Sequence, residues 1–396
     1  MSHSNNGVIY GLDYRSGKLI KVTIKDGYIQ EVSFETESSL GDNLWIGPGL
    51  VDIQVNGFHG NDFNTFPLKE EVVRNVTKYL WQEGVTAYMP SVITNSDERI
   101  EQALEVISNF IETDQMGENI PGIHLEGPFI SPEDGPRGAH HREYVKAPDW
   151  ELFQRWQQAA NGHISIVTLS PEWPTAPEFI KKCVQTGVKV SIGHTAATTE
   201  QIRLAVDAGA SFSTHLGNGA HPLLPRHPNY IWDQLAIDEL WAGIIGDGFH
   251  LPISVLKVFY KVKQNRTILV SDAVDIAGLE PGEYTTHVGG HVVLTSEGKL
   301  HLANDPKLLA GSVKSLRQGM ETFVKERICN LQEVWEMASI NPMRMLNGEK
   351  VNGLTVGSPA DLVLFQFVSP GELKVVKTIK RGKVVFESEG KKVTHN

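Results

Sequence analysis

The feature that most constrains the fold is a short apolar run that recurs eight times and ends each time at a polar or glycine-rich position. Between the runs lie stretches with apolar residues at three- and four-residue spacing, such as 68–84 and 199–210, which end near Gly84 and Gly209. Such runs are typical of strands covered on both faces, and such stretches of amphipathic helices that stop at glycine. The runs occupy residues 50–57, 85–94, 120–128, 164–172, 188–195, 211–218, 241–250 and 267–274.

Eight strand–helix units over roughly 300 residues match a parallel (β/α)8 barrel of the α/β class better than an open sheet. The chain ends differ, because residues 8–34 and 360–390 alternate polar with β-branched residues around turn dipeptides. Each end is too short to form its own core, so we expect both to share one small β-sandwich. The expected domains are residues 1–49 plus 350–396, and the barrel at 50–349.

The composition limits the partners and the compartment. The 396 residues include 36 Lys and Arg against 47 Asp and Glu, a net charge of −11, which disfavours nucleic acid or an anionic membrane as the main partner. Two distant cysteines, no leader-like N-terminus and no apolar run near the ~18 residues that span a bilayer predict a cytoplasmic protein. A chain of this length folds without a structural metal, so a metal site in it would be catalytic.

Side chains suited to chemistry lie at the ends of the runs, where barrels carry their catalytic residues. Glu126, His194 and His215 end the third, fifth and sixth runs. One carboxylate and two imidazoles suit a divalent cation of the zinc or iron type and leave coordination open for water. A single histidine near a strand is more often a hydrogen-bonded structural residue, so the prediction depends on all three converging.

Further candidate residues lie at the ends of later runs or in the loops after them. Asp272, at the end of the eighth run, is placed to accept a proton from water that the cation activates; a structural role as a helix cap or histidine partner is the alternative. His250 is placed to hydrogen-bond a substrate oxygen, whereas a structural role is the stronger interpretation for Asp247. The glycine-rich loop after the sixth run carries Arg226, whose planar guanidinium suits phosphate, although an ordinary turn with a solvated arginine explains it equally well.

The motifs HLEGPF, SIGHT, THLGN, GDGFH and VSDA occur in this order, with GSPADLVLF near the end. Over nearly the whole chain this combination resembles the N-acetylglucosamine-6-phosphate deacetylases of the amidohydrolase superfamily. The resemblance implies that Glu126, His194 and His215 bind one divalent metal ion, for which zinc is favoured over iron, cobalt or manganese. It also implies that Asp272 is the acid/base. The substrate contacts that it implies are Ala139, His140, Asn218, Gly219, Arg226, His250, Leu309, Ala310, Gly311 and Ser312.

The resemblance also implies a homodimer, because Arg226 would reach the phosphate of a small sugar phosphate bound to the neighbouring subunit. Many superfamily members carry His-x-His in the first strand to bind a second metal, but this chain has Gln54 and Asn56 there. The fourth run lacks the lysine that bridges two metals in several relatives. Both departures favour a single metal, and His59 is not expected to be a ligand. The sixth loop has Asn-Gly at 218–219 where the family usually has Asn-Ala.

We therefore expect a metal-dependent hydrolase that removes the N-acetyl group of an N-acetylhexosamine 6-phosphate, with N-acetylglucosamine 6-phosphate first, giving glucosamine 6-phosphate and acetate. Three alternatives stay open: the galactosamine epimer, another amidohydrolase reaction, and a catalytically silent sugar-phosphate sensor. The phosphate-type loop argues against ring opening or deamination. Retention of the three ligand residues and Asp272 argues against a silent sensor.

Overall fold

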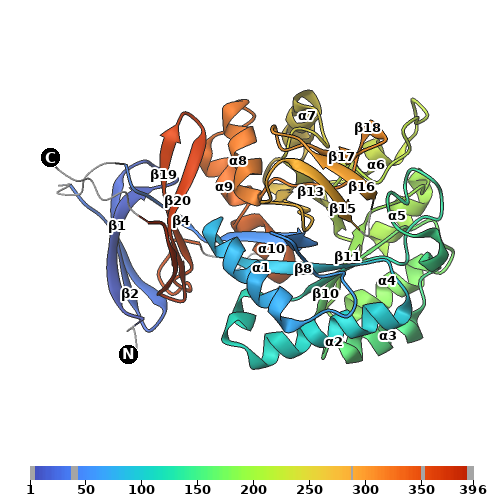
Figure 1. Ribbon diagram of the computed structural model, residues 1–396, viewed down its shortest axis with the longest axis horizontal. Helices are drawn as coiled ribbons and strands as arrows, with labels where there is room; N and C mark the ends of the chain where they lie inside the picture. Colours follow the sequence, from blue (N-terminus) through green and yellow to red (C-terminus); the bar gives the residue numbers. More distant parts are fainter. Residues whose placement is uncertain (1–4, 37–42, 287–288, 349–352, 390–396) are drawn as a thin grey trace.

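In a computed structural model, which describes residues 5–36, 43–286, 289–348 and 353–389, the middle of the chain forms a parallel eight-stranded barrel (Figure 1). Each strand pairs with the next in chain order. The strands are β5 (Leu50–Val55), β8 (Val85–Ile93), β9 (Ile123–Glu126), β10 (Ile164–Leu169), β11 (Lys189–Ile192), β12 (Phe212–Ser213), β13 (Trp241–Ile245) and β14 (Thr267–Val270). Each predicted run contains one of them, which confirms the expected barrel. Hydrogen bonds from Asp272 N to Gln54 O (3.0 Å) and from Asn56 N to Ala273 O (2.8 Å) join its two ends.

Helices cover the outside of the barrel. The first seven barrel strands are each followed by one helix, and the last by three, which complete the ring and its base. The helices are α1 (Glu70–Gln82), α2 (Asp97–Thr113), α3 (Trp150–Ala159), α4 (Ala176–Gln185), α5 (Thr199–Asp207), α6 (Tyr230–Ala236), α7 (Ile253–Lys263), α8 (Leu316–Lys325), α9 (Leu331–Met337) and α10 (Ile340–Asn347). The predicted glycine stops after α1 and α5 are confirmed, because Gly84 and Gly209 have φ of +82° and +112°, a backbone region that glycine enters without steric cost.

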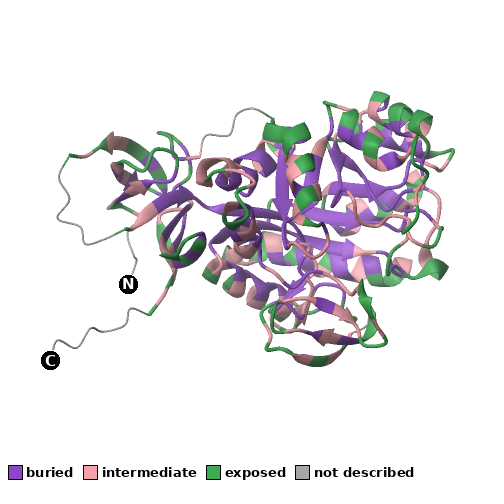
Figure 2. Cartoon of the chain, turned by 90° about the horizontal axis from the view of Figure 1, so that it is seen from above, coloured by how far each residue is buried: buried purple, intermediate pink, exposed green. Residues whose placement is uncertain are grey.

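One layer of the barrel interior is apolar. A cluster of buried side chains fills this layer, and Met345 from α10 packs against it from below. Figure 2 shows the resulting buried band through the centre of the molecule. The cluster consists of Val51, Ile53, Met89, Ile166, Phe212, Ile245, Ile268, Val270 and Met345. The polar residues singled out from the sequence lie at the C-terminal ends of the strands, where they can serve a site.

The two chain ends come together in one small β unit, as expected, and in the described residues this unit is a single mixed sheet where a sandwich was expected. Its strands form a mixed seven-stranded sheet that lies beside the barrel at the left of Figure 1. In spatial order they are β21 (Lys383–Glu387), β20 (Glu372–Lys380), β19 (Leu362–Ser369), β4 (Trp45–Pro48), β1 (Gly7–Asp13), β2 (Leu19–Lys25) and β3 (Tyr28–Phe34). Strand β4 joins the two ends, since it pairs in parallel with β1 and antiparallel with β19. The expected domain boundary between residues 349 and 350 lies outside the described residues.

Two small sheets lie at the C-terminal end of the barrel, and neither was predicted from the sequence. The hairpin β6 (Gly57–Phe58) and β7 (Asn61–Asp62) follows the first barrel strand. A four-stranded antiparallel sheet follows the last one, made of β15 (Gly282–Thr286), β16 (Gly290–Leu294), β17 (Leu300–Leu302) and β18 (Asp305–Leu309). Both contribute residues to a cavity at this end of the barrel.

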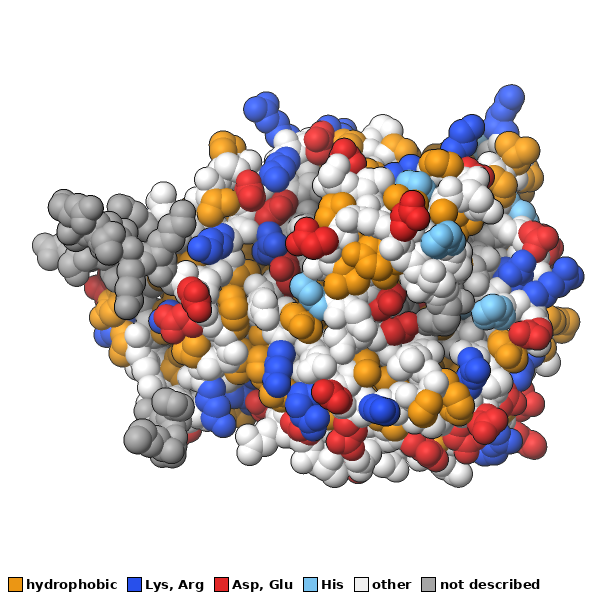
Figure 3. All heavy atoms as spheres, viewed as in Figure 1, with side chains coloured by type: hydrophobic (Ala, Val, Ile, Leu, Met, Phe, Trp, Pro, Cys, Tyr) orange, Lys and Arg blue, Asp and Glu red, His pale blue; other side chains and the backbone are white. Residues whose placement is uncertain are grey.

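Acidic and basic side chains are interspersed on the face of the molecule drawn in Figure 3. Among the helices of the described ranges, none combines the length and apolarity that a bilayer span requires.

Candidate active site

Glu126, His194 and His215 converge on one point at the C-terminal end of the barrel. Glu126 is the last residue of β9, and the two histidines each lie two residues beyond β11 and β12. Oε1 of Glu126 lies 3.0 Å from Nε2 of His194 and 2.9 Å from Nε2 of His215, and the two Nε2 atoms are 3.0 Å apart. All three side chains are buried. Three ligand atoms therefore face one another at the separations expected around one small cation.

The hydrogen bonds behind these residues fit a metal site. Nδ1 of His194 lies 2.8 Å from the carbonyl oxygen of Pro136, so Nδ1 donates a hydrogen bond to that oxygen and Nε2 is the nitrogen that faces the cluster. Burial alone would raise the pKa of Glu126, but the hydrogen bonds from both histidines lower it well below its ordinary value. Burial lowers the pKa of His215, and its contact with Glu126 more than offsets this, raising it to about 8. A divalent cation that displaces the protons from the two Nε2 atoms would be held by these nitrogens and the anionic carboxylate.

Asp272 faces this cluster and is held by an amide. Asn56 Nδ2 donates to Oδ1 of Asp272 at 2.8 Å, and Gln54 Nε2 donates to Oε2 of Glu126 at 3.1 Å. Each neutral amide thus orients one carboxylate. Burial, with the nearby charge of Glu126, raises the pKa of Asp272 to about 6. A carboxyl group with such a pKa can take up and release a proton near neutral pH.

The backbone is strained at three of these four residues. His194, His215 and Asp272 have φ of +49°, +27° and +48°, in the left-handed region that residues other than glycine rarely adopt. Each of them lies two residues beyond the end of a barrel strand. Strain of this kind, of order 1–3 kcal/mol per residue, clusters at functional sites because the surrounding structure must enforce it.

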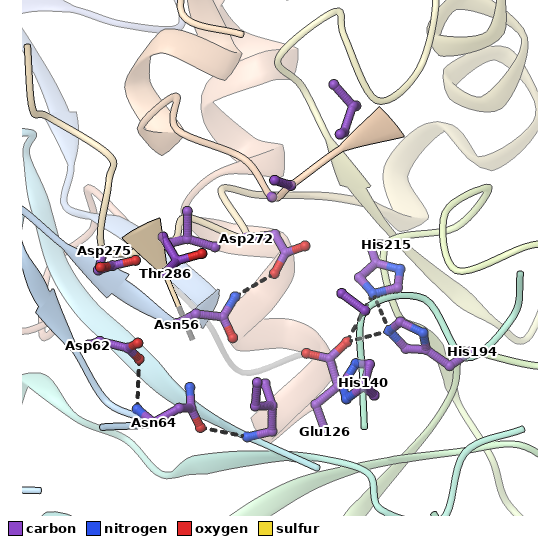
Figure 4. A pocket seen from close by; sticks show the side chains of 16 residues that line it. Asn56, Asp62, Asn64, Glu126, His140, His194, His215, Asp272, Asp275 and Thr286 are labelled. Atoms are coloured by element: carbon purple, nitrogen blue, oxygen red, sulfur yellow. Dashed lines mark hydrogen bonds and ion pairs between the residues drawn. The ribbon is translucent and has the colours of Figure 1, made fainter. Parts of the chain in front are cut away.

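The cluster opens into a cavity of about 160 Å³ (Figure 4). Nine of the residues singled out from the sequence as ligands, base or substrate contacts line it: Glu126, Ala139, His140, His194, His215, Asp272, Leu309, Ala310 and Gly311. His140 adds a further imidazole, because its ring and the ligand atoms of Glu126 and His194 all lie within 4.8 Å of one another. Burial lowers the pKa of His140 to about 3, so its ring is neutral.

Other predicted contacts lie outside this cavity. Asn218 and Gly219 line a small pocket behind His194, on whose ring Gly219 packs. Arg226 is exposed on the loop before α6. Ser312 is buried and bonds through its carbonyl to Val274 N. His250 pairs with Asp247.

Several cavity residues were not predicted from the sequence. They are Asp62, Asn64, Ile93, Val274, Asp275 and Thr286, and Figure 4 shows Asp62 and Asp275 across the cavity from His194. Asp275 could have been found from its place three residues after Asp272, and Asp62 from the polar segment after the first strand. Thr286 gave no signal, because it lies on the unanticipated sheet. His59 lies elsewhere and stacks on Tyr79 with ring centroids 4.2 Å apart.

A barrel that carries a carboxylate, two histidines and an aspartate at its strand ends is typical of metal-dependent hydrolases. Comparison with known proteins agrees with this class. The model of the amidohydrolase family matches residues 45–385. The chain is 32% identical to the N-acetylglucosamine-6-phosphate deacetylase of Bacillus subtilis (strain 168), covering 93% of each chain. It is 32% identical to that of Mus musculus, covering 87% of this chain and 84% of the mouse protein.

A solved structure agrees as well. The N-acetylglucosamine-6-phosphate deacetylase of Thermotoga maritima is 28% identical and superposes with a TM-score of 0.83, covering 96% of this chain and 100% of that one. Within the amidohydrolases, the chain belongs to the N-acetylglucosamine-6-phosphate deacetylase family.

Proposed function

We propose that this protein hydrolyses the amide bond of N-acetylglucosamine 6-phosphate to glucosamine 6-phosphate and acetate. The observation that carries the proposal is the convergence of one carboxylate oxygen and two imidazole nitrogens within 3.0 Å, opposite an aspartate with a raised pKa. The relatives that share about a third of its sequence bear the name of this activity.

In this proposal Glu126, His194 and His215 hold one divalent cation, zinc before iron, cobalt or manganese. Their ligand atoms are the three that lie 2.9–3.0 Å apart, whereas His140 belongs to a looser group within 4.8 Å. A cation bound there supplies Lewis-acid polarisation of the acetyl carbonyl and lowers the pKa of water. Gln54 and Asn56 supply amides that bond to carboxylates in place of a second pair of histidines, in keeping with a single cation.

Asp272 moves the proton. Its Oδ1 accepts the amide hydrogen of Asn56, which leaves Oδ2 to take a proton from the attacking water. Water oxygen bonds to the acetyl carbon, and Asp272 then delivers the proton to the nitrogen as the carbon–nitrogen bond breaks. The products are acetate and the free amine, and Asp272 returns to its ionised form. A pKa near 6 suits both transfers.

The substrate is oriented by side chains around the same cavity. His140 is neutral, and its buried Nδ1 has no hydrogen-bond partner in the described part of the chain, so it is available to a sugar hydroxyl. Leu309, Ala310 and Gly311 form a wall from the end of β18. We assign His250 to a substrate oxygen and Asn218, Gly219 and Ser312 to the support of this wall and of His194.

In this proposal the phosphate group of the substrate is bound by a second subunit. Neither Lys nor Arg occurs among the cavity-lining residues that the structure describes. Arg226 is exposed, and the nearby Leu223 is 89% exposed, so this loop is available to a neighbouring copy of the chain. We therefore propose a homodimer in which Arg226 binds the phosphate held by its partner. Mixing Asp272→Asn and Arg226→Ala proteins should restore activity if the site is shared, and should restore none if each chain works alone.

Acetate release tests the proposed function. The purified protein is assayed with N-acetylglucosamine 6-phosphate, its galactosamine epimer and unphosphorylated N-acetylglucosamine, with and without chelator. We expect chelator-sensitive release from the first substrate and release at least about tenfold slower from the unphosphorylated sugar, since a charged contact contributes about 1.5–3 kcal/mol. No release from any substrate would refute the proposal. We place the reaction in the cytoplasm, which cell fractionation tests.

A further inference from the structure

Glu172 connects the loops that follow β9, β10 and β11. Its Oε1 accepts a hydrogen bond from the hydroxyl of Ser131 at 3.0 Å. Its Oε2 accepts two, from the hydroxyl of Ser170 at 2.7 Å and from the backbone N–H of Ala196 at 2.9 Å. Ser131 lies in the loop after β9, Ser170 directly after β10, and Ala196 in the loop after β11. One side chain thus holds three neighbouring loops together at the C-terminal end of the barrel.

These hydrogen bonds surround the backbone of His194. Its carbonyl oxygen accepts the N–H of Ser131 at 2.8 Å. The hydroxyl of Thr195, the next residue, lies 2.8 Å from that of Ser170. Ser131, Ser170 and Thr195 are all buried. The backbone at and directly after His194 is therefore attached to partners that are themselves bonded to Glu172.

The conformation of His194 requires such support. Its φ of +49° lies in the left-handed region, which residues other than glycine keep only where the surrounding structure enforces it. From this conformation its Nε2 lies 3.0 Å from Oε1 of Glu126 and 3.0 Å from Nε2 of His215 (Figure 4). Its Nδ1 lies 2.8 Å from the carbonyl oxygen of Pro136, in the loop after β9. The bonds of Glu172 thus fix both the backbone that directs the ring and the loop that holds it.

A carboxylate suits this position because it only accepts hydrogen bonds. Its two oxygens together offer about four lone-pair sites, enough for the three donors that face them. The main chain of Glu172 is also held, since Gln201 of α5 donates to its carbonyl oxygen at 3.2 Å. Glu172 is not among the residues that line the cavity. It therefore acts on the site through other residues and not by contact with a substrate.

We propose that Glu172 is a positioning residue whose three hydrogen bonds hold His194 in the conformation that directs Nε2 toward Glu126 and His215. By doing so it sets the affinity of this site for a divalent cation. Groups that orient a metal ligand in this way typically contribute about 10- to 100-fold to metal affinity. The inference rests on the metal site of the proposed function.

Titration with Co²⁺ tests the proposal without a measurement of activity. The metal-free, full-length protein is titrated with Co²⁺ alone, whose visible absorption reports both binding and the geometry of the ligands. Glu172→Ala removes all three hydrogen bonds, so it should bind Co²⁺ at least about tenfold more weakly than the wild type, with an altered spectrum. If this variant does not fold, Glu172→Asp takes its place, because its shorter side chain cannot span the loops. Unchanged affinity and spectrum would overturn the proposal.

Glu172→Gln separates the hydrogen bonds from the charge. Its amide oxygen can still accept from Ser170 and Ala196, and its amide nitrogen can donate to the hydroxyl oxygen of Ser131. Its affinity for Co²⁺ should therefore stay within about threefold of the wild type, less than the contribution of a lost orienting group. A loss as large as that of Glu172→Ala would show that the charge supports the cation, and would overturn the proposal.

Asp361→Ala is the matched control for a general loss of stability. The carboxylate of Asp361 accepts the backbone N–H of Arg381 at 2.8 Å and Nζ of Lys380 at 2.9 Å in the small sheet, away from the cavity. This variant should unfold at a lower temperature but bind Co²⁺ as the wild type does. Weakened binding equal to that of Glu172→Ala would overturn the proposal. A wild type that takes up no Co²⁺ would refute the metal site of the proposed function, and this inference with it.

Discussion

Replacing Asp272 by Asn separates proton transfer from metal binding. The new side chain has the same shape, and its carbonyl oxygen can still accept the 2.8 Å hydrogen bond from Asn56. The hydrogen bond of Asp272 is to Asn56, whereas the ligand atoms of Glu126, His194 and His215 contact one another. The substitution removes only the oxygen that takes and returns the proton.

The expected loss follows from that role. General acid–base catalysis by one side chain contributes about 10²- to 10⁴-fold, or about 3–5 kcal/mol of barrier. Asp272→Asn should therefore lower kcat by at least about 10²-fold while the protein keeps one equivalent of metal. The pKa of Asp272, which burial raises to about 6, makes it suited to both transfers.

The assay combines acetate release with metal analysis on the same samples. Asp52→Asn is the matched control, since Asp52 is buried in the same barrel but does not line the cavity, and kcat should change by less than about threefold. An Asp272→Asn enzyme with near-normal turnover would refute the assignment. Loss of the metal together with activity would show that Asp272 is a ligand rather than the base.

Three further predictions concern pH and stability. Because Asp272 must be ionised to accept a proton, kcat/KM should fall tenfold per unit below an inflection at or below about pH 6, and a flat profile down to pH 4 would contradict this. Burial raises the pKa of Asp52 from 3.8 to about 7. Between these two pH values the folded protein keeps a proton on Asp52 that the unfolded chain has released. The stability of the folded state therefore falls as the pH rises through this range. Asp52→Asn should therefore gain up to about 4 kcal/mol relative to wild type between pH 4 and 8 in urea unfolding with chelator, and an equal difference at both pH values would refute the shift. Arg317 pairs with Glu83 (3.0 Å) and Glu321 (2.6 Å) where α8 meets β20; Arg317→Met should cost about 3 kcal/mol in urea unfolding, and a neutral result would exclude a stabilising role for this network.

Much of the fold could be predicted because its periodicity is strong. Strands such as the one in the apolar run 164–172, and helices that end at glycine such as α5, can be recognised from the local sequence pattern alone. The β15–β18 sheet could not be predicted, because its strands are short and largely exposed, with no apolar run to mark them. Strand β4 has four residues and gains its place only by pairing with β1 and β19, which lie far apart in the sequence.

The site likewise contains residues that the sequence could predict and features that it could not. Glu126, His194 and His215 could be brought together from the sequence, because parallel strands end on one face of a barrel. The left-handed backbone at His215 gives no signal in the sequence, nor does the contribution of Thr286 from an inserted sheet. Arg226 lies on an exposed loop, and its role depends on a second copy of the chain, which one sequence cannot place.

The most direct test of the account is the metal content of the purified protein, measured by mass spectrometry after dialysis, beside that of Glu126→Gln and His215→Ala. The account predicts one equivalent of a divalent metal in the wild type and less than about a tenth in each variant, because each loses one of three ligands. A wild-type protein that releases acetate at full rate with no bound metal would contradict it.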